Sequence, residues 1–334
     1  MIRQIFTLIG RDGEINMVTR KMVAERAGVS EATVSYVLNN TKKVTDEVRK
    51  RVIRAAGELN YHPDRIARSL ASRSSGHVVL LVESMKDPYC LQLLSGAQRA
   101  AMKNGYIVTM MARDSLQIDL IAELGSRRVD GLLLGEGCLD DQIAGTAGDY
   151  GIAVVTPGTY TRIESGKAYC AMVEDLAARG HREIAFLSGR PINSLGERCY
   201  QLYRTAMEQN GLECPEELTV DRLENGVQDS AWGETAAEIL LSGDAHFTAW
   251  IVGNDLMAMG ALKKLRSRGY PMEGNIITAV GSKTGLLDYM EPQLPGVDEK
   301  GELCGEYLME ELIVRRRNRE PEIRVIEAEY IRPN

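Results

Sequence analysis

The sequence has no long hydrophobic run. None of its apolar stretches approaches the roughly 18 residues that a membrane-spanning helix needs. The short apolar patch Ile5–Ile9 is followed by charged residues and by no small-residue cleavage signal. Prolines are few, at 10, and the 32 glycines follow no G-X-Y period, which argues against disordered and collagen-like chains. These absences predict a folded chain of 334 residues with neither an export signal nor a membrane span.

Cysteine and histidine are also sparse. The six cysteines form no C-x-x-C pair and lie near no histidine at ligand spacing, so we expect no metal site and a reducing, cytoplasmic location. The four histidines stand alone, without a nucleophile or an acid at a useful spacing. The run Gly281-Ser282-Lys283-Thr284 resembles a fragment of a phosphate loop, but its spacing is wrong. The sequence therefore predicts no enzyme and no cofactor.

The chain as a whole lacks a positive net charge, since its net charge is −7, but its first part is basic. Residues 17–76 contain 12 Lys and Arg against 6 Asp and Glu, whereas residues 77–334 contain 26 against 39. A basic segment attached to an acidic one is typical of a nucleic-acid-binding module joined to a part that stays off the phosphates.

The basic segment shows three short helical patterns, which follow Thr19, Ser30 and Thr45. We expect these side chains to face inward: Met22, Val23, Ala24, Ala27, Val34, Val37, Leu38, Val48, Val52, Ala55 and Leu59. Gly28 separates the first two helices, and the second exposes small and polar side chains. This arrangement is typical of a helix-turn-helix that enters a major groove, although an ordinary helical hairpin shows the same pattern.

From His77 onward, short apolar β-rich runs alternate with amphipathic helical segments. The expected strands are Val78–Val82, Ile107–Met111, Gly131–Leu134, Ala153–Thr156, Ile184–Leu187, Ala249–Val252, Ile276–Val280 and Ile323–Ala328. The expected helices are Tyr89–Asn104, Leu116–Arg127, Lys167–Arg179, Glu197–Asn210, Thr235–Leu241, Leu256–Arg268 and Leu303–Arg317. Such alternation predicts parallel sheets covered by helices, in two lobes with a ligand cleft between them.

The residues of the basic segment resemble those of the lac repressor (LacI/GalR) family of bacterial transcriptional regulators. The motif V-T-x-x-x-V-A-x-x-A-G-V-S-x-A-T-V-S-x-V-L-N begins at Val18 and is followed by V-T-D-E-V-R-K-R-V and L-N-Y-H-P-D-R-I-A-R-S-L. The resemblance covers residues 18–334. It implies an N-terminal all-α helix-turn-helix DNA-binding domain and an α/β two-lobed, periplasmic-binding-protein-like (type I) effector domain.

The resemblance implies contacts to operator DNA from the second helix and its surroundings. Glu31 either accepts from a cytosine amine or points to solvent, Ala32 offers a methyl contact to thymine, and Tyr36 stands where arginine is common. Residues Asp64–Ser72 resemble a hinge helix that orders on DNA and inserts Leu70 into the minor groove. The implied DNA-binding residues are Thr19, Ser30, Glu31, Ala32, Thr33, Ser35, Tyr36, Asn39, Lys42, Arg68, Ser69 and Leu70.

The effector domain departs from the family pattern at its expected pocket. Ser282-Lys283 replaces a pair of aspartates, of which one commonly grips sugar hydroxyls in the family. The implied effector-binding residues are Tyr89, Arg198, Asn254, Asp255, Ser282 and Lys283. Lys283 with Arg198 favours an anionic effector such as a sugar phosphate. The alternatives are a Lys283 side chain exposed at the cleft lip, or no small effector at all.

We therefore expect a DNA-binding transcriptional regulator, most simply a repressor, that acts as a homodimer on a pseudo-palindromic operator and responds to a small carbohydrate or anionic metabolite. The alternative is a small-molecule-binding protein of the same fold without a DNA role. The expected organisation is an extension over 1–16, disordered or the result of a misassigned start before Met17, a helix-turn-helix domain over 17–62, a hinge and linker over 63–76, and an effector and dimerisation domain over 77–334.

Overall fold

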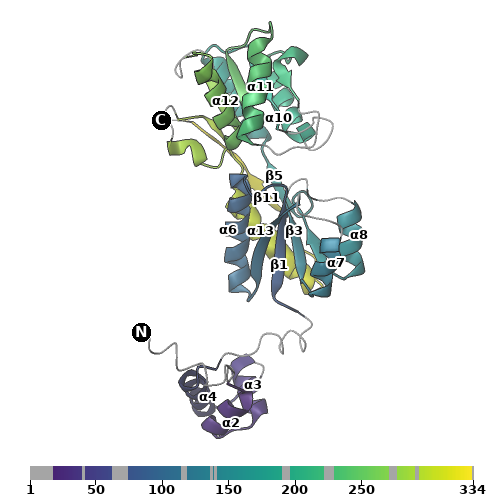
Figure 1. Ribbon diagram of the computed structural model, residues 1–334, viewed down its shortest axis with the longest axis vertical. Coiled ribbons are helices and arrows are strands. Elements are labelled where there is room, and N and C mark those ends of the chain that lie inside the picture. Colours follow the sequence, from purple (N-terminus) through teal and green to yellow (C-terminus); the bar gives the residue numbers. More distant parts are fainter. Residues whose placement is uncertain are drawn as a thin grey trace, which may run out of the picture. The chain divides into compact units, whose positions relative to one another are not determined.

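The chain forms two compact units, Met1–Arg73 and Ser74–Asn334, which we call the head and the body. The computed structural model in Figure 1 describes residues 18–39, 42–61, 74–113, 119–135, 138, 141–189, 196–221, 229–270, 277–289 and 293–332. The predicted extension over 1–16 and the predicted hinge helix Asp64–Ser72, with Arg68, Ser69 and Leu70, lie outside the described residues.

The head contains three helices, α2 (Arg20–Ala27), α3 (Glu31–Asn39) and α4 (Asp46–Glu58). The hydroxyls of Thr19 and Thr45 accept backbone hydrogen bonds at the starts of α2 and α4, each at 3.4 Å, as their positions predict. Gly28 ends α2 with a φ of 64°, a left-handed conformation that glycine adopts without strain. The three predicted helices are thereby confirmed.

The head has its own apolar core, which all three helices share. Its buried members are Val23, Ala24, Ala27, Val34, Val37, Val52, Ala55 and Ala56. The prediction that Met22 faces inward is wrong, because 44% of this side chain is exposed. Val23 and Ala24 already fill the inward face of this turn, so Met22, one residue earlier, projects to the side.

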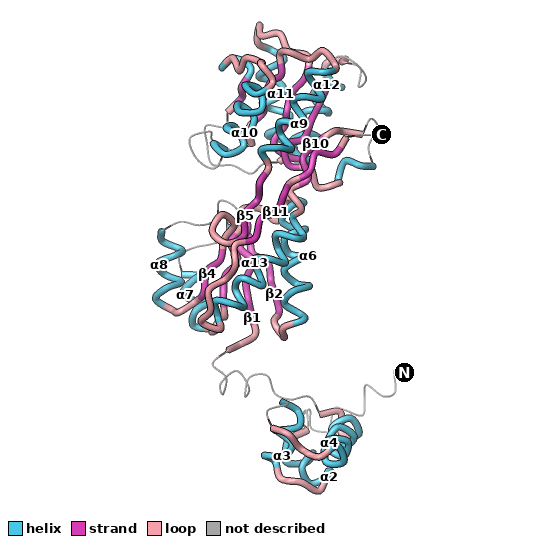
Figure 2. The backbone as a smooth tube through the Cα atoms, turned by 180° about the vertical axis from the view of Figure 1, so that it is seen from behind, coloured by secondary structure: helices cyan, strands magenta, loops and turns pink. Residues whose placement is uncertain are grey.

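The body consists of two lobes, each built on a sheet of mostly parallel strands (Figures 1 and 2). The first lobe has the strand order β2 (Ile107–Ala112), β1 (His77–Val82), β3 (Gly131–Leu134), β4 (Ala153–Val155). The second has the order β12 (Glu329–Ile331), β10 (Gly296–Asp298), β9 (Ile277–Ser282), β8 (Ala249–Asn254), β6 (Ile184–Leu187), β7 (Thr219–Val220), in which β12 alone is antiparallel to its neighbour.

Helices cover both faces of each sheet. The helices of the body are α6 (Pro88–Lys103), α7 (Asp119–Ser126), α8 (Asp141–Asp149), α9 (Gly166–Ala178), α10 (Gly196–Gln209), α11 (Ser230–Ser242), α12 (Asp255–Ser267) and α13 (Gly301–Arg316), with short 3-10 turns η3 (Glu216–Leu218) and η4 (Leu286–Tyr289). Along β1, Val78, Leu80 and Val82 pack against the α6 and α13 face, whereas Val79 and Leu81 belong to the core on the other face. The two-residue period of a strand buried on both sides explains the continuous apolar run.

Three segments of chain connect the lobes. The strands β5 (Thr161–Glu164) and β11 (Arg324–Glu327) pair in parallel and lead into α9 and β12, and the chain between β10 and α13 returns to the first lobe. Figure 1 shows β5 and β11 between the two lobes. The predicted strand Ile323–Ala328 therefore exists as β11 but belongs to this connection rather than to a main sheet.

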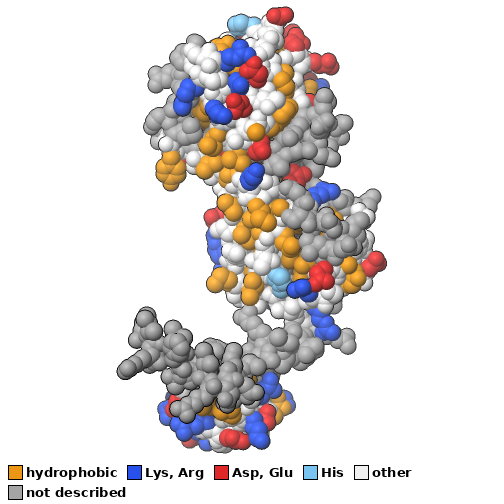
Figure 3. All heavy atoms as spheres, in the orientation of Figure 1, with side chains coloured by type: hydrophobic (Ala, Val, Ile, Leu, Met, Phe, Trp, Pro, Cys, Tyr) orange, Lys and Arg blue, Asp and Glu red, His pale blue; other side chains and the backbone are white. Residues whose placement is uncertain are grey.

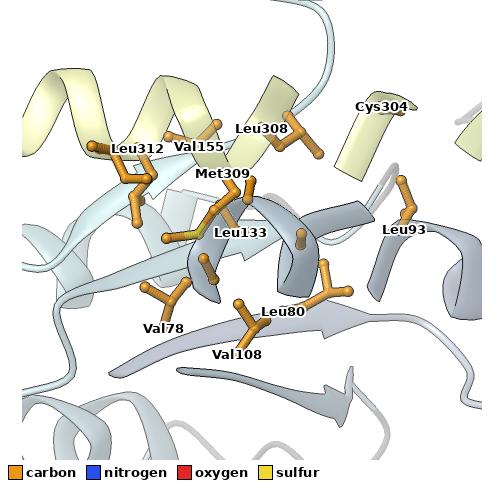
Figure 4. Packing of buried hydrophobic residues seen from close by; sticks show 14 of the residues in the cluster. Val78, Leu80, Leu93, Val108, Leu133, Val155, Cys304, Leu308, Met309 and Leu312 are labelled. Carbon is orange, nitrogen blue, oxygen red and sulfur yellow. The ribbon is translucent and has the colours of Figure 1, made fainter. Parts of the chain in front are cut away.

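Two pairs of helices pack unusually closely through glycines. A Cβ atom at Gly96 of α6 would lie 1.8 Å from the backbone oxygen of Glu302, and one at Gly305 of α13 would lie 2.0 Å from that of Leu93. Figure 4 shows α13 lying over the apolar cluster that it shares with α6 and the sheet. In the second lobe, Gly233 and Gly260 allow the same close approach between α11 and α12. These glycines fix how closely each helix pair approaches.

Candidate functional site

The helix α3 displays its predicted DNA-binding residues on the surface of the head. Glu31 and Ala32 at its start are exposed, Thr33, Ser35 and Tyr36 are half-buried, and Val34 and Val37 are buried against α2 and α4. The hydroxyl of Ser30 accepts a hydrogen bond from the Thr33 N–H at 3.2 Å and lies 2.9 Å from the Thr33 hydroxyl. The start of α3 therefore combines an ordered turn with an exposed outer face. The side chain of Asn39 lies outside the described part of the chain.

Basic side chains flank this helix. The ammonium of Lys42, three positions after the end of α3, lies over the ring of Tyr36, 4.7 Å from its centroid. Arg26 and Glu58 form an ion pair of 2.8 Å that connects α2 to α4. In Figure 3, Lys and Arg side chains lie on the described surface of the head, together with some Asp and Glu side chains. Such a surface can hold phosphates while α3 lies against base edges.

The predicted effector residues of the second lobe gather at the carboxyl ends of β8 and β9. Asn254 and Ser282 are paired in the register of these two strands. The side-chain oxygen of Asn254 accepts a hydrogen bond from the Met257 N–H at 3.0 Å and so caps α12. Ligands in open α/β sheets bind at such strand ends. The register thus places these residues where an effector site is expected.

Asp255, the next residue, is fully buried. One carboxylate oxygen accepts hydrogen bonds from the backbone N–H of Thr284, at 2.8 Å, and from the Thr284 hydroxyl. The other oxygen has no hydrogen-bond partner among the described residues. Burial raises the pKa of Asp255, and the bonds from Thr284 oppose this rise in part.

Lys283 is buried as well, with 4% of its side chain exposed. Its ammonium donates a hydrogen bond to the carboxylate of Asp288, which lies on η4. The alternative that Lys283 is exposed at the cleft lip is therefore wrong. The neighbouring glycine at position 296 leaves room for the Lys283 side chain, since a Cβ there would lie 2.9 Å from the Lys283 Cβ.

Arg198, on α10, contacts the chain that connects the lobes. Its guanidinium donates to the Ile163 carbonyl at 3.0 Å and to the Ser165 hydroxyl at 3.4 Å, and it lies 3.7 Å from the carboxylate of Glu299. The Ser165 hydroxyl in turn donates to Glu299 at 2.7 Å. Two of the three connecting segments, the one that contains β5 and the one between β10 and α13, are thus joined to the second lobe by one cluster, which we call the crossover cluster (Ile163, Ser165, Arg198 and Glu299).

Tyr89 contributes from the first lobe, where Asp87 caps α6 by accepting the Tyr89 N–H at 3.0 Å. A Cβ at Gly301 would lie 2.9 Å from the Tyr89 ring, so Tyr89 borders the start of α13. Close by, Gln92 donates to the Thr284 carbonyl at 3.1 Å, a direct bond between the two lobes. The predicted effector residues therefore all lie where the lobes meet.

Ser165, Thr284, Asp288 and Glu299 were not predicted as residues of the site, although Thr284 belongs to the run that resembles a phosphate-loop fragment. Their partners come from distant parts of the chain, and no spacing rule identifies such pairs. A separate groove of about 390 Å³ lies beside α6 and α13, and its lining residues include none of the predicted effector residues. Among the described residues, no cluster of potential metal ligands occurs, and no helix is both long and apolar enough to cross a bilayer.

Comparison with known proteins assigns both units. Residues 19–64 match the family described as bacterial regulatory proteins, lacI family, and residues 75–312 match the periplasmic binding proteins and sugar binding domain of the LacI family. The chain belongs to the LacI family. Operator DNA and a small-molecule effector are the partners typical of this family, whose members are regulators rather than enzymes.

Individual relatives align over nearly the whole chain. The transcriptional repressor PurR of Serratia proteamaculans is 30% identical over 93% of this chain and 94% of its own length. The ribose operon repressor of Haemophilus influenzae is 27% identical over 90% and 93%. The predicted function of a DNA-binding transcriptional repressor with an effector-binding domain is thereby confirmed, and the alternative without a DNA role is excluded.

Solved structures confirm the fold. A complex of the transcriptional regulator CelR with cellobiose has a TM-score of 0.69 at 26% identity, covering 95% of this chain and 99% of that one. The lac repressor dimer bound to operator and an anti-inducer has a TM-score of 0.77 at 23% identity, covering 95% and 98%. The fold is the predicted one, a helix-turn-helix head and a two-lobed, periplasmic-binding-protein-like body.

Proposed function

We propose that this LacI-family repressor binds a pseudo-palindromic operator in the cytoplasm as a homodimer, with one α3 in each half-site. In this proposal Glu31, Ala32 and Tyr36 face base edges. The surrounding contacts come from Thr19, Ser30, Thr33, Ser35, Asn39 and Lys42. Residues 63–76, with Arg68, Ser69 and Leu70, connect the heads to the bodies and contact the minor groove. The observation that carries the proposal is the exposed, ordered start of α3 beside a basic surface.

Chromosomal fragments captured by the purified protein provide the test. A fragment that contains two related half-sites about one helical turn apart should be bound at lower concentration than an unrelated fragment of equal length. Binding should weaken steeply with salt, because phosphate contacts release counterions. Selection of single, unpaired half-sites would contradict the dimeric arrangement.

We further propose that the effector binds between the lobes, at Tyr89, Arg198, Asn254, Asp255, Ser282 and Lys283, and that it is a carbohydrate. The names of relatives include a ribose operon repressor and a complex with cellobiose, which support this class. Lys283 and Arg198 each already lie against a carboxylate, that of Asp288 or Glu299. An anionic effector must displace these carboxylates, so the ion pairs favour a neutral sugar over a sugar phosphate.

Calorimetry with neutral sugars and their phosphates tests this proposal. A neutral sugar should bind, and its affinity should change little in Lys283→Met, which keeps the apolar stem and removes the charge that pairs with Asp288. If only phosphorylated sugars bind, and Lys283→Met abolishes that binding, Lys283 is an anion-binding residue and the neutral-sugar proposal fails. Binding of the effector shifts operator affinity through a change in lobe arrangement, typically by about 1–3 kcal/mol.

A further inference from the structure

The carboxylate of Asp130 binds the described end of segment 63–76, which is residues 74–76. Asp130 directly precedes β3 and is 2% exposed. It accepts hydrogen bonds from the Ser74 hydroxyl at 2.6 Å, the Ser75 N–H at 3.2 Å and the Gly76 N–H at 2.8 Å. Three consecutive residues are thus fixed by a single buried side chain, immediately before β1 begins.

The same aspartate is bound from the other side by the last residue of α13. Arg316 lies 3.0 Å from a carboxylate oxygen of Asp130 and also donates to its backbone carbonyl at 3.0 Å. A buried carboxylate is costly unless it is paired and fully hydrogen-bonded, and these contacts meet both conditions. We call this group the linker anchor (Ser74, Ser75, Gly76, Asp130 and Arg316).

The helix α13 connects the linker anchor to the crossover cluster. Glu299 lies two residues before α13, and Arg316 ends it. Sixteen helical residues span about 24 Å. At its start α13 packs closely on α6 through Gly96 and Gly305, and near its end Leu312 packs against Gly131 of β3, so the helix has little room to bend or slide independently. A shift of the crossover cluster therefore displaces the Arg316 end as well.

We propose that Asp130 and Arg316 are positioning residues that fix the direction in which segment 63–76 leaves the body and that couple this direction, through α13, to the crossover cluster. The inference rests on the proposed role of segment 63–76 as the connection between the head and the body. An anchored linker holds a head near its half-site position. A loosened linker must be ordered at the moment of binding, which lowers operator affinity.

The first experiment compares Arg316→Ala and Arg316→Lys with Arg317→Ala in the full-length protein. Lysine keeps the charge but cannot bond the carboxylate and the backbone carbonyl of Asp130 together with a planar fork. Arg317 is the exposed neighbour, and its removal changes the net charge by the same amount as Arg316→Ala. Hydrogen exchange of the segment that contains Gly76 reports the anchor directly, and binding to the captured operator reports its consequence.

Both Arg316 variants should exchange the Gly76 amide faster and bind operator more weakly, by roughly tenfold for Arg316→Ala. Arg317→Ala should change neither measurement comparably, and binding to an unrelated fragment should be nearly equal in Arg316→Lys and the wild type. Faster exchange with unchanged operator affinity would overturn the proposal, as would an equal loss in Arg317→Ala. The exchange measurement needs no DNA, so an unchanged exchange rate of the Gly76 amide in the Arg316 variants would by itself contradict the linker anchor. Failure of the wild-type chain to select paired half-sites counts against the proposed function alone.

The second experiment tests the coupling along α13. Glu299→Gln removes the charge that faces Arg198, at the opposite end of the helix from Arg316. Effects of substitutions this far apart normally add. We expect Glu299→Gln to change operator affinity in the wild type and to have a clearly smaller effect in Arg316→Lys. Additive effects, or no effect of Glu299→Gln in the wild type, would show that α13 does not transmit the state of the crossover cluster.

Discussion

The two units present their functional side chains in opposite ways. In the head, Glu31 and Ala32 are exposed on a helix that is held by local caps. In the body, Asp255 and Lys283 are buried, and each is already bonded to a residue of the same lobe, Thr284 or Asp288. The predicted DNA-facing side chains of the head are therefore already exposed, whereas a ligand that contacts Asp255 or Lys283 must replace the hydrogen bonds that these residues make within the lobe. We propose that this exchange of bonds couples effector binding to the arrangement of the lobes.

A substitution that disrupts the core of the head tests whether the two units fold independently. Val52 of α4 is fully buried, so Val52→Asp places a charge in a core of very few residues, a cost of several kcal/mol. A domain this small has little stability to lose. We expect the head to unfold and operator binding to fall by more than about a hundredfold, with the thermal transition of the body unchanged.

Ile53→Asp is the matched control, since Ile53 is the next residue of α4 and 56% of its side chain is exposed. It should leave the helical signal of the head intact and weaken DNA binding only through its charge. A melting transition of the body that shifts with Val52→Asp would contradict the division into independent units.

The close contact of α6 and α13 gives the converse test, in which the body is weakened and the head is not. Gly96→Ala forces a methyl group against the Glu302 carbonyl and should destabilise the body by about 1–3 kcal/mol. Gly145→Ala in the exposed part of α8 meets no atom within 4 Å, so it should be neutral or stabilise by about 0.5–1 kcal/mol. Thermal melting of the body separates the two. Equal effects would show that the close approach at Gly96 is not required.

The head and the body also differ in how much of their structure the sequence predicts. The helices of the head and their caps were predicted closely because Thr19, Gly28 and Thr45 act on residues within four positions of themselves. The long strands of the body were predicted for a similar reason, since β1 and β8 are continuous apolar runs. The short strands β5, β7, β10 and β12 were not predicted, because their two to four residues form no continuous apolar run such as those of the equally short β3 and β6.

The effector site was predicted only in outline. Asn254 and Asp255 lie at a strand end, which topology alone makes a ligand position. The pairing of Arg198 with Glu299, or of Gln92 with Thr284, joins residues about 100 to 190 positions apart and depends on how the two lobes meet. The anionic effector was inferred from the charges of Lys283 and Arg198 alone, and their carboxylate partners weaken that argument.

A smaller effect separates two kinds of contact on the head itself. Lys42→Ala should weaken binding to operator and to unrelated DNA alike and reduce the salt slope by about 1, because an ammonium near a phosphate carries no sequence information. Glu31→Ala should instead change the preferred bases, by about 1–3 kcal/mol at one position if Glu31 accepts from a cytosine amine. Titrations of operator and single-base variants at several salt concentrations distinguish them. An unchanged base preference in Glu31→Ala would indicate that Glu31 points to solvent and accepts no bond from a base.

The smallest expected effect sharpens the contrast between an exposed and a buried acid, through Asp255→Asn. Burial raises the pKa of Asp255 in the folded protein above that of the unfolded chain. The ionised form of Asp255 is therefore disfavoured in the folded protein. Its ionisation lowers the free energy of unfolding as the pH rises through the folded pKa, and this loss disappears at pH values below the ordinary carboxyl range. Asparagine keeps an oxygen for the Thr284 N–H and carries no charge. We expect Asp255→Asn to melt at a higher temperature than the wild type at pH 7, and this difference in melting temperature to shrink toward pH 4.

Asp244→Asn, which alters an exposed carboxylate, is the control, and its melting temperature should not converge with that of the wild type in this way. An advantage of Asp255→Asn that is constant with pH would mean that burial of the charge is not what the substitution relieves.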